Sequence, residues 1–495
     1  MLEGMATTIA LGIGILLAVG PPLAEARASN TPLVRVDDTQ VEVYSDDGKL
    51  IERHTLNDKG EKTGPFEAFG TGGGVTARGT YRKGELHGKF EEFTEAGELL
   101  RESMYSRGVR DGFLREYIFN VCVLREIYKD GVLNGRWESF DPENSHEINA
   151  TYKRGVLEGR YVEYRFSGEW KREANYKKGL LHGAAKITFG KKSVSKRKWE
   201  KGRLVDLDGI APFPVPLETL RAELAEARVV PEAGPGAKAG DPLSPDRMVA
   251  LGRLRTYRAA CGVPWRHLRL DRRLNDLCDA ASEVSQGNGK LSHTPEQPAG
   301  MDEERFQQGS KGAGNSNLSS GPMASSVDSY MDDSDASNID RVGHRRWCLN
   351  PSMGVTGFGQ AGRWSAMWAM DQSGPGPGKA KTILYPPAGY VPVDLFGPRH
   401  AWSLHALNGR MPQSADSLEI RVVRLDEYFQ EVGPPLELDW KSLSTEGFGG
   451  SPCIIFRPVG VKVNPGARYS VTLQWTKGKE PDHRYLVEFV AGPSR

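Results

Sequence analysis

Glycine recurs at a fixed spacing through the first half of the chain, and this repeat is the strongest constraint on its fold. Each copy has an aromatic residue, a glycine three positions later and a second glycine four positions after that, beginning with Tyr81, Gly84 and Gly88. The first glycines are 23 or 24 residues apart, at Gly84, Gly108, Gly131, Gly155 and Gly179, with incomplete copies at Gly60 and Gly202. A period of this length is typical of proteins built from stacked supersecondary units.

Each copy is expected to form a β-hairpin. The first glycine supplies the positive φ of a tight turn, and charged residues flank it. Aromatic residues recur after the second glycine, as at Phe90, Trp137 and Tyr161. One hairpin cannot bury these rings, whereas stacked hairpins can, so the copies should join into one sheet. We therefore interpret these glycines and aromatics as structural and assign them no catalytic role.

The YxxGxxxG core resembles MORN repeats in their bacterial variant, over residues 56–204. The resemblance implies an elongated β-sheet module that serves for binding, with partners that differ from one protein to another. We place this module at residues 40–205.

The first thirty residues have the pattern of an export signal. Residues 6–19 are uncharged, and Ala26-Arg27-Ala28 fits a small-x-small cleavage site. Fourteen residues rise ~21 Å as a helix, less than the ~30 Å of a hydrocarbon core, which favours a cleaved signal peptide over 1–28. The segment before it carries Glu3 and no Lys or Arg, which is unusual for such a signal. We expect a secreted, periplasmic or cell-envelope protein, with an uncleaved membrane anchor as the alternative.

Charge is balanced over the whole chain but uneven within the repeats. The net charge of +1 excludes a global field for specific nucleic-acid binding, and 38% hydrophobic residues with a mean hydropathy of −0.49 exclude a polytopic membrane protein and a wholly disordered chain. Residues 151–204 hold 16 Lys and Arg against 5 Asp and Glu. This region is expected to attract an anionic surface, such as phospholipid headgroups or an envelope polymer, unless it is simply a solvated basic face.

The composition changes after the repeats. Residues 206–245 are rich in Pro, Gly and Ala and are interpreted as a linker that includes a short helix over 217–228. From Asp246 the apolar period becomes 3.6, with a helix that ends near Gly262 and a second one capped by Asp271. Residues 309–321 are expected to form a polar loop, a helix is expected near 327–331, and 355–370 should form short strands. Five cysteines are too few for a disulfide scaffold, although one bridge within 261–348 is possible.

Several motifs of this region resemble the CAP superfamily, the SCP-like or PR-1-like domain, over residues 246–372. They are Leu291-Ser-His293, Gly343-His344, Leu349-Asn350-Pro351 and Gly357-Phe358-Gly359. The resemblance implies an αβα sandwich with a cleft lined by two histidines and two acids. Matched by position, the histidines are His293 and His344 and one acid is Asp333. Ser316 stands where the family has its other acid, a glutamate, so the set is incomplete.

The chemistry of that cleft has three interpretations. His293 and His344 could hold a divalent metal such as Zn²⁺, but two imidazoles with one carboxylate make a weak site. A peptide or ester hydrolase would need a nucleophile beside a base, and neither Ser292 nor Ser316 lies in a known nucleophile motif. We favour a third interpretation, in which these polar residues hold loops by hydrogen bonds and no cofactor is required.

The last segment, 380–495, resembles bacterial Ig-like or fibronectin-III-like modules in its stretch Val463-Asn-Pro-Gly-Ala-Arg-Tyr469. Strands are expected over 418–423, 453–457 and 469–475.

The sequence as a whole predicts a multidomain α+β protein: a β-hairpin repeat sheet, an αβα sandwich of CAP type and a small β-sandwich. We expect a non-enzymatic binding protein, monomeric or of unspecified oligomeric order, whose partner is an envelope component, a protein or a lipid. The alternative is a hydrolase or metal-dependent enzyme that acts through the cleft histidines.

Overall fold

The computed structural model describes residues 33–35, 39–165, 169–190, 193–229, 244–407, 411–412, 414–475 and 482–492. The chain divides into two compact units, Met1–Ala211 and Pro212–Arg495. The expected signal peptide over 1–28 lies outside the described residues, and so do residues 230–243 of the expected linker. Among the helices that are described, none is long and apolar enough to cross a membrane.

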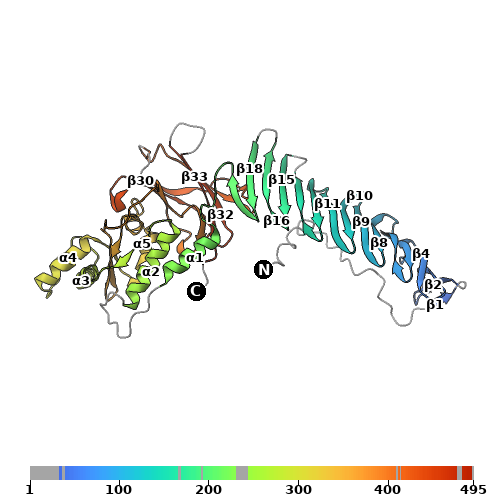
Figure 1. Ribbon diagram of the computed structural model, residues 1–495, viewed down its shortest axis with the longest axis horizontal. Coiled ribbons are helices and arrows are strands. Elements are labelled where there is room, and N and C mark those ends of the chain that lie inside the picture. The colour runs from blue at the N-terminus through green and yellow to red at the C-terminus, as the bar shows by residue number, and fades with distance from the viewer. Residues whose placement is uncertain are drawn as a thin grey trace. The chain divides into compact units, whose positions relative to one another are not determined.

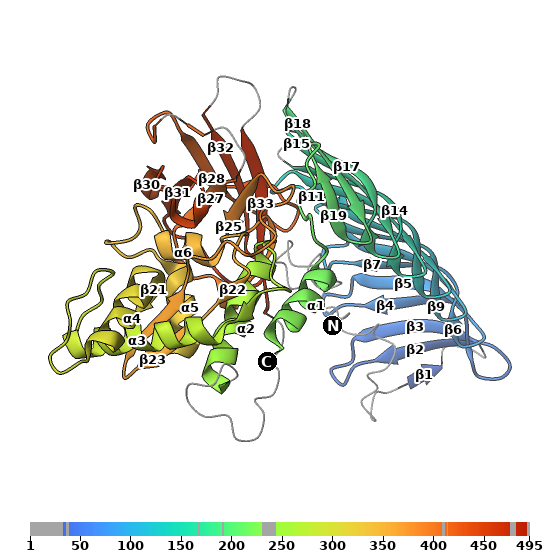
Figure 2. The same cartoon turned by 60° about the vertical axis from the view of Figure 1, so that its left-hand side comes forward.

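The first unit is a single antiparallel sheet in which each hairpin pairs with the next along the chain (Figures 1 and 2). Its strands are β1 (Leu33–Arg35), β2 (Gln40–Tyr44), β3 (Leu50–Leu56), β4 (Lys62–Phe69), β5 (Val75–Arg82), β6 (Glu85–Leu86), β7 (Gly88–Phe93), β8 (Leu99–Ser106), β9 (Val109–Ile118), β10 (Val121–Lys129), β11 (Val132–Asp141), β12 (His146–Lys153), β13 (Val156–Leu157), β14 (Gly159–Arg165), β15 (Trp170–Lys177), β16 (Leu180–Leu181), β17 (Gly183–Phe189), β18 (Ser193–Glu200) and β19 (Arg203–Leu207).

The first glycine of each repeat occupies a tight turn, and its expected positive φ is confirmed. Gly84 has φ 81° and Gly155 has φ 76°, and the residues before them, Lys83 and Arg154, are at 54° and 53°. Two successive residues with positive φ define a type I′ turn, whose twist matches that of the flanking strands. The Gly84 N–H donates to the Lys62 carbonyl of the preceding repeat at 2.9 Å, and equivalent bonds recur in every later repeat. The turns are therefore stacked along one edge of the sheet.

The second glycine of each repeat lies directly opposite the aromatic residue of the next repeat. The pairs are Gly88 with Tyr105, Gly112 with Tyr128, Gly135 with Tyr152, Gly159 with Tyr176 and Gly183 with Trp199. A glycine opposite an aromatic ring leaves room for the ring to lie over the backbone. The rings also meet one another, as in the edge-on contact of Phe66 with Tyr81, whose centroids are 5.3 Å apart. This stacking gives a one-layer sheet an apolar core.

In the part of the second unit that the structure describes, six α-helices combine with short and long strands (Figure 1). The helices are α1 (Leu217–Arg228), α2 (Pro245–Ala260), α3 (Arg272–Asn288), α4 (Glu303–Gly314), α5 (Met323–Asp332) and α6 (Gly343–Cys348). The strands are β20 (Arg269–Leu270), β21 (Ser316–Ser319), β22 (Val355–Thr356), β23 (Phe358–Ala361), β24 (Trp364–Trp368), β25 (Thr382–Tyr385), β26 (Gly389–Pro392), β27 (Trp402–Ala406), β28 (Glu419–Leu425), β29 (Glu431–Val432), β30 (Leu438–Ser444), β31 (Cys453–Pro458), β32 (Arg468–Gln474) and β33 (His483–Val490). The larger sheets are β25-β27-β31-β30 and β26-β33-β32-β28-β29.

The expected fold class is wrong. The protein is mainly β, with 44% of residues in strands and 19% in helices, and its largest element is the antiparallel sheet over 40–207 rather than an αβα sandwich. The strands within 246–372 form only small sheets, β20-β22 and β21-β24-β23, so this segment lacks a large central sheet. Helices α2, α5 and α6 instead share one apolar core with 380–495, in which Leu254 and Val327 join Trp402 and Phe489, while α3 and α4 belong to a separate, smaller cluster.

A glycine-rich stretch expected to be a loop is partly helical. Residues 309–314 belong to α4, which packs along α3. A Cβ on Gly312 would lie 2.1 Å from the Leu277 carbonyl oxygen, so glycine at this position lets the two helices come close. Gly359 of β23 does the same beneath α3, where a Cβ would lie 2.1 Å from the Asp279 nitrogen. The glycines of this segment therefore serve helix packing, which local composition does not reveal.

All five cysteines are free thiols, so no bridge forms within 261–348. The helix over 217–228 and the Asp271 cap are confirmed, the latter by a bond of 3.0 Å from the Leu274 N–H to the Asp271 carboxylate.

Candidate functional site

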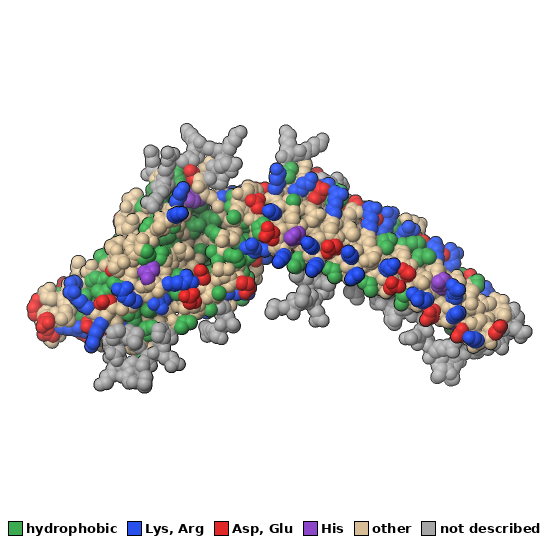
Figure 3. Space-filling view, viewed as in Figure 1, with side chains coloured by type: hydrophobic (Ala, Val, Ile, Leu, Met, Phe, Trp, Pro, Cys, Tyr) green, Lys and Arg blue, Asp and Glu red, His purple; other side chains and the backbone are tan. Residues whose placement is uncertain are grey.

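One face of the repeat sheet carries a continuous row of residues that are direct partners across the strands from β2 to β18. The row runs through Glu42, Arg53, Glu67, Arg78, Glu91, Glu102, Arg115, Arg125, Glu138, Asn149, Val162, Glu173, Lys186 and Lys196. Acidic and basic side chains alternate over much of it, and Figure 3 shows both kinds interspersed over the sheet. Since a shift by one residue would turn these side chains to the other face, the row helps to define the register.

Ion pairs neutralise the first part of this row. Arg78 lies 2.6 Å from Glu91, and Lys89 bridges the neighbouring acids Glu91 and Glu102 at 2.7 and 3.0 Å. Burial alone would raise the pKa of Glu102, but hydrogen bonds from Arg115, Tyr117 and Lys89 outweigh it and lower the pKa from 4.5 to about 2. Glu102 is therefore ionised at every ordinary pH.

Glu102→Gln is expected to make the sheet less sensitive to acid. Because its folded pKa lies below the unfolded value, the carboxylate stabilises the sheet fully above pH 4.5 and loses this contribution as the pH falls toward about 2. The variant should lose of the order of 2 kcal/mol at pH 7 and show a flatter acid limb in chemical unfolding. Glu98→Gln, at an exposed turn position, is the control. Identical acid limbs for wild type and Glu102→Gln would contradict this prediction.

Basic side chains outnumber acidic ones at the end of the row, around Glu173 of β15. Glu173 is shared by Lys186 at 2.7 Å, Arg160 at 3.0 Å and Lys171 at 3.2 Å. The hydrogen bond from Lys186 is the largest cause that lowers the pKa of Glu173 to about 2, and bonds from Arg160 and Lys171 add to it. One carboxylate thus neutralises one of three positive charges at this point.

The turns at the first glycines form a second cationic feature, which we call the turn edge. It comprises the two residues before each first glycine from Gly84 to Gly202. Nine of these are Lys or Arg and two are acidic: Arg82, Lys83, Arg107, Lys129, Lys153, Arg154, Lys177, Lys178 and Lys201 against Asp130 and Glu200. All eleven are exposed. Arg107 and Asp130 of this set form a long ion pair of 3.9 Å, and most of the other cations face solvent.

Aliphatic side chains follow the glycines along the turn edge. Val109, Val132, Val156 and Leu180 each occupy the position after a first glycine and are 40–46% exposed. Each lies close to the first glycine of the next repeat, so that a Cβ added to Gly155 would lie 3.5 Å from Val132. The turn edge is therefore a line of cations beside a line of partly exposed aliphatic groups.

In the second unit the structure brings together two of the four residues expected in a cleft. His344, at the start of α6, bonds through Nδ1 to Oδ1 of Asp333 at 2.8 Å. The Arg345 N–H donates to the other Asp333 oxygen at 3.3 Å. Asp333 and Val342 have φ of 44° and 43°, and Val342 is fully buried. Positive φ at a β-branched residue is strained, and such strain tends to occur at functional sites.

The other two expected residues have separate surroundings. His293 is exposed and bonds through Nδ1 to the Ala313 carbonyl at 2.8 Å. Ser316 is buried on β21, with its hydroxyl 3.6 Å from the Cys278 thiol of α3. The next residue, Asn317, points to the opposite side and donates to the His344 carbonyl at 3.0 Å. The Ser316 hydroxyl therefore faces α3 rather than the Asp333–His344 pair.

A hollow of about 480 Å³ is lined in part by Asp332, the residue before Asp333, and was not expected from the sequence. Its lining comes from α2, α5 and the segment that contains the 3₁₀ helix η2 (Val393–Leu395), and its polar members are Arg253, Tyr257, Asp328, Ser329, Asp332, Asp394 and His400. Asp332 directly precedes Asp333 at the end of α5. Its carboxylate lines the hollow, whereas that of Asp333 bonds to His344. The sequence signal that could have indicated the hollow is this Asp-Asp pair, since the other lining residues lie far away along the chain.

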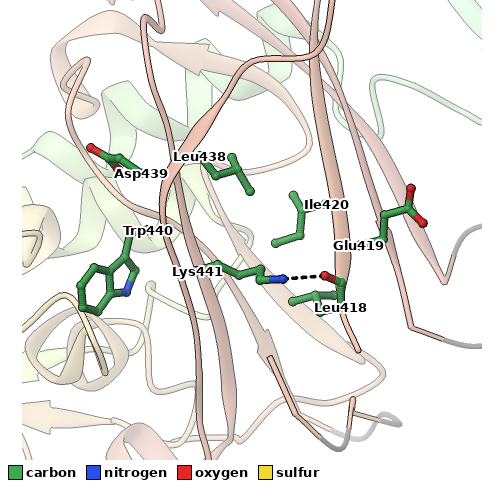
Figure 4. Close-up of a pocket in the computed structure, with 7 residues that line it drawn as sticks. All are labelled: Leu418, Glu419, Ile420, Leu438, Asp439, Trp440 and Lys441. Carbon is green, nitrogen blue, oxygen red and sulfur yellow. Dashed lines mark hydrogen bonds between the residues drawn. The ribbon is translucent and has the colours of Figure 1, made fainter. Parts of the chain in front are cut away.

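A second hollow, of about 420 Å³, lies between β28 and β30. Figure 4 shows Leu438, Ile420 and Lys441 facing one another while Trp440 points away, and the Lys441 ammonium donates to the Leu418 carbonyl at 3.0 Å. It has two apolar walls and no cluster of catalytic groups.

No protein-family model and no curated protein matches the chain. Within the described part of the chain, no group of three or more His, Cys, Asp or Glu side chains is arranged to hold a metal ion.

Proposed function

We propose that this protein is a non-enzymatic binding protein whose repeat sheet holds a linear anionic polymer along the turn edge. The observation that carries the proposal is the charge of the turn edge, where six stacked turns hold nine Lys and Arg but only two Asp and Glu. Together with the resemblance to MORN repeats, this favours a binding role for the module. The binding requires no cofactor.

The spacing of the turns suits a chain-like ligand. Adjacent strands lie ~4.8 Å apart, so successive turns are ~9.6 Å apart and offer one or two cations each. A polymer that carries negative groups along its length can contact several turns at once, and each contact raises the effective concentration for the next. The aliphatic groups beside the cations can pack against its backbone.

We also propose that the protein is exported and that the polymer belongs to the cell envelope or extracellular space. Support comes from the signal-peptide pattern over 1–28, which lies outside the described residues. Detection of the intact N-terminus on the protein after export would contradict cleavage.

The experiment measures binding of the full chain to dextran sulfate, with neutral dextran and anionic vesicles as further probes. Lys153→Gln, Arg154→Asn, Lys177→Gln and Lys178→Asn, combined, remove four cations from two turns. Asn is favourable at the positive-φ positions 154 and 178, so the turns should keep their conformation. We expect at least a ten-fold loss of affinity and a weaker dependence on salt, with unchanged thermal stability.

The matched control removes four exposed cations from the second unit, Arg272, Arg273, Lys290 and Lys311, each replaced by Gln. Equal losses for the two quadruple variants would show that only total charge matters and would contradict the proposal. Binding to anionic vesicles but not to dextran sulfate would replace the polymer with a lipid surface.

Hydrolysis through His344 is a second candidate, favoured by its 2.8 Å bond to Asp333. A carboxylate that orients a histidine is an arrangement used by general bases. Among the described residues no hydroxyl or thiol is bonded to the His344 ring, so a nucleophile would have to be water. Hydrolysis of an ester pool by the wild type that His344→Ala abolishes, while His293→Ala does not, would establish this activity.

A further inference from the structure

The hollow beside α5 contains three carboxylates, two of which are already neutralised. Asp328 accepts from Arg253 at 2.6 Å and from the Tyr257 hydroxyl at 2.7 Å. Asp394 lies 2.5 Å from Arg228 and 3.5 Å from Arg253. The third carboxylate, Asp332, is half exposed and has His400 as its only ion-pair partner among the described residues.

The hydrogen bonds around His400 indicate which of its two ring nitrogens carries the proton. Tyr385 is buried, and its hydroxyl has one proton, which it donates to the Leu395 carbonyl at 2.8 Å. That carbonyl has no other donor among the described residues, so donation elsewhere would leave it unsatisfied. The Tyr385 oxygen therefore accepts from Nδ1 of His400, 3.0 Å away. In the neutral ring this leaves Nε2 with a lone pair.

The lone pair of Nε2 faces a second acceptor. Nε2 lies 3.6 Å from Oδ1 of Asp332, too far for a hydrogen bond between them. Burial is the main cause that lowers the pKa of His400 to about 4, Arg345 lowers it further, and Asp332 and Asp328 oppose the shift. The ring is thus neutral at pH 7, so two acceptors border the hollow, Nε2 of His400 and the Asp332 carboxylate. Among the described residues no Lys or Arg lies within ion-pair distance of that carboxylate, and Arg345 donates to the backbone carbonyl of Asp332 rather than to its side chain.

We infer that this hollow binds a primary ammonium group, which donates N–H bonds to Nε2 of His400 and to Oδ1 of Asp332. An ammonium has three donors and one positive charge, so it satisfies both acceptors and forms a direct ion pair with the Asp332 carboxylate. The alkyl part of the ligand occupies the rest of the hollow, which Ser329 and Gly397 help to line. The ligand class is a small aliphatic amine or a lysine side chain, and the site is independent of the turn edge.

The first test needs no ligand. In the full chain with ¹⁵N-labelled histidine at pH 7, NMR should show His400 as the neutral tautomer with the proton on Nδ1. A proton on Nε2, or a doubly protonated ring, would overturn the inference.

The second test uses n-butylammonium as the probe, with butyltrimethylammonium, which has no N–H donors, as the matched control. We expect the Nε2 resonance to move saturably with the first and not with the second. Asp332→Asn, a change at a half-exposed side chain, should weaken n-butylammonium binding at least ten-fold, and the exposed Asp416→Asn should leave it unchanged. Equal binding of both probes, or of both variants, would overturn the inference, and so would no binding of n-butylammonium at all.

Discussion

Arg345→Ala is expected to lower the free energy of unfolding of the second unit by about 4 kcal/mol. The Arg345 side chain is fully buried, and its guanidinium donates to the carbonyls of Met331 at 2.7 Å and Ala401 at 2.7 Å. It also donates to the Asp332 carbonyl and lies over the Tyr385 ring at 4.4 Å. Its loss leaves buried carbonyls at the end of α5 and just before β27 without donors, in addition to a cavity.

The measurement is chemical unfolding of the full chain, followed by a probe specific to the second unit. Arg363→Ala provides the matched control, because Arg363 is exposed and its one side-chain contact among the described residues is with the Trp364 ring, so its loss should cost no more than ~0.5 kcal/mol. A similar small loss for Arg345→Ala would show that water replaces the lost donors and that the buried guanidinium is not required.

The repeat sheet was the most predictable part of the fold, because its information is local and recurs. Gly84 and Gly108 need positive φ for steric reasons that act within one turn, and the same reasons apply in each copy. The opposition of Gly88 and Tyr105 was not foreseen, although it explains why the second glycine is needed. It depends on register between repeats, which spacing alone does not specify.

The second unit was less predictable because its organisation depends on contacts between distant segments. Local periodicity correctly located α1, α2 and α3, but the core that joins Leu254 to Trp402 and Phe489 has no local signature. The expected division at residues 372–380 follows a change in composition, whereas the apolar core runs across it. Local patterns therefore predicted the positions of several helices, but the αβα sandwich expected for this segment is wrong.

The same distinction applies to the candidate sites. Asp333 and His344 are eleven residues apart, and the match by position suggested both; the structure places them in contact. Asp332, Arg253 and His400 meet only through tertiary structure, so apart from the adjacent Asp332 and Asp333 no sequence pattern could have indicated the hollow. The Ser316 hydroxyl points toward α3 because side chains alternate along β21, which a match by position does not take into account.

Gly312→Ala is expected to destabilise the second unit by about 3 kcal/mol, since it forces α3 and α4 apart. An added Cβ would lie 2.1 Å from the Leu277 carbonyl oxygen and 2.9 Å from the Leu277 carbonyl carbon. These are backbone atoms of α3, which cannot move aside as a flexible side chain could. Alanine favours an isolated helix by up to ~1 kcal/mol over glycine, so propensity alone predicts the opposite sign.

Thermal and chemical unfolding of Gly312→Ala and Gly447→Ala separate these two effects. Gly447 lies in a loop with φ −77°, and a Cβ added there would meet open space, so alanine should change stability by no more than ~0.5 kcal/mol. The nearby Gly314→Ala serves as a helix control, because its added Cβ would have only an ordinary contact of 3.5 Å to the His293 carbonyl. A gain in stability for Gly312→Ala would show that α4 does not pack this closely on α3, because only then could helix propensity determine the outcome.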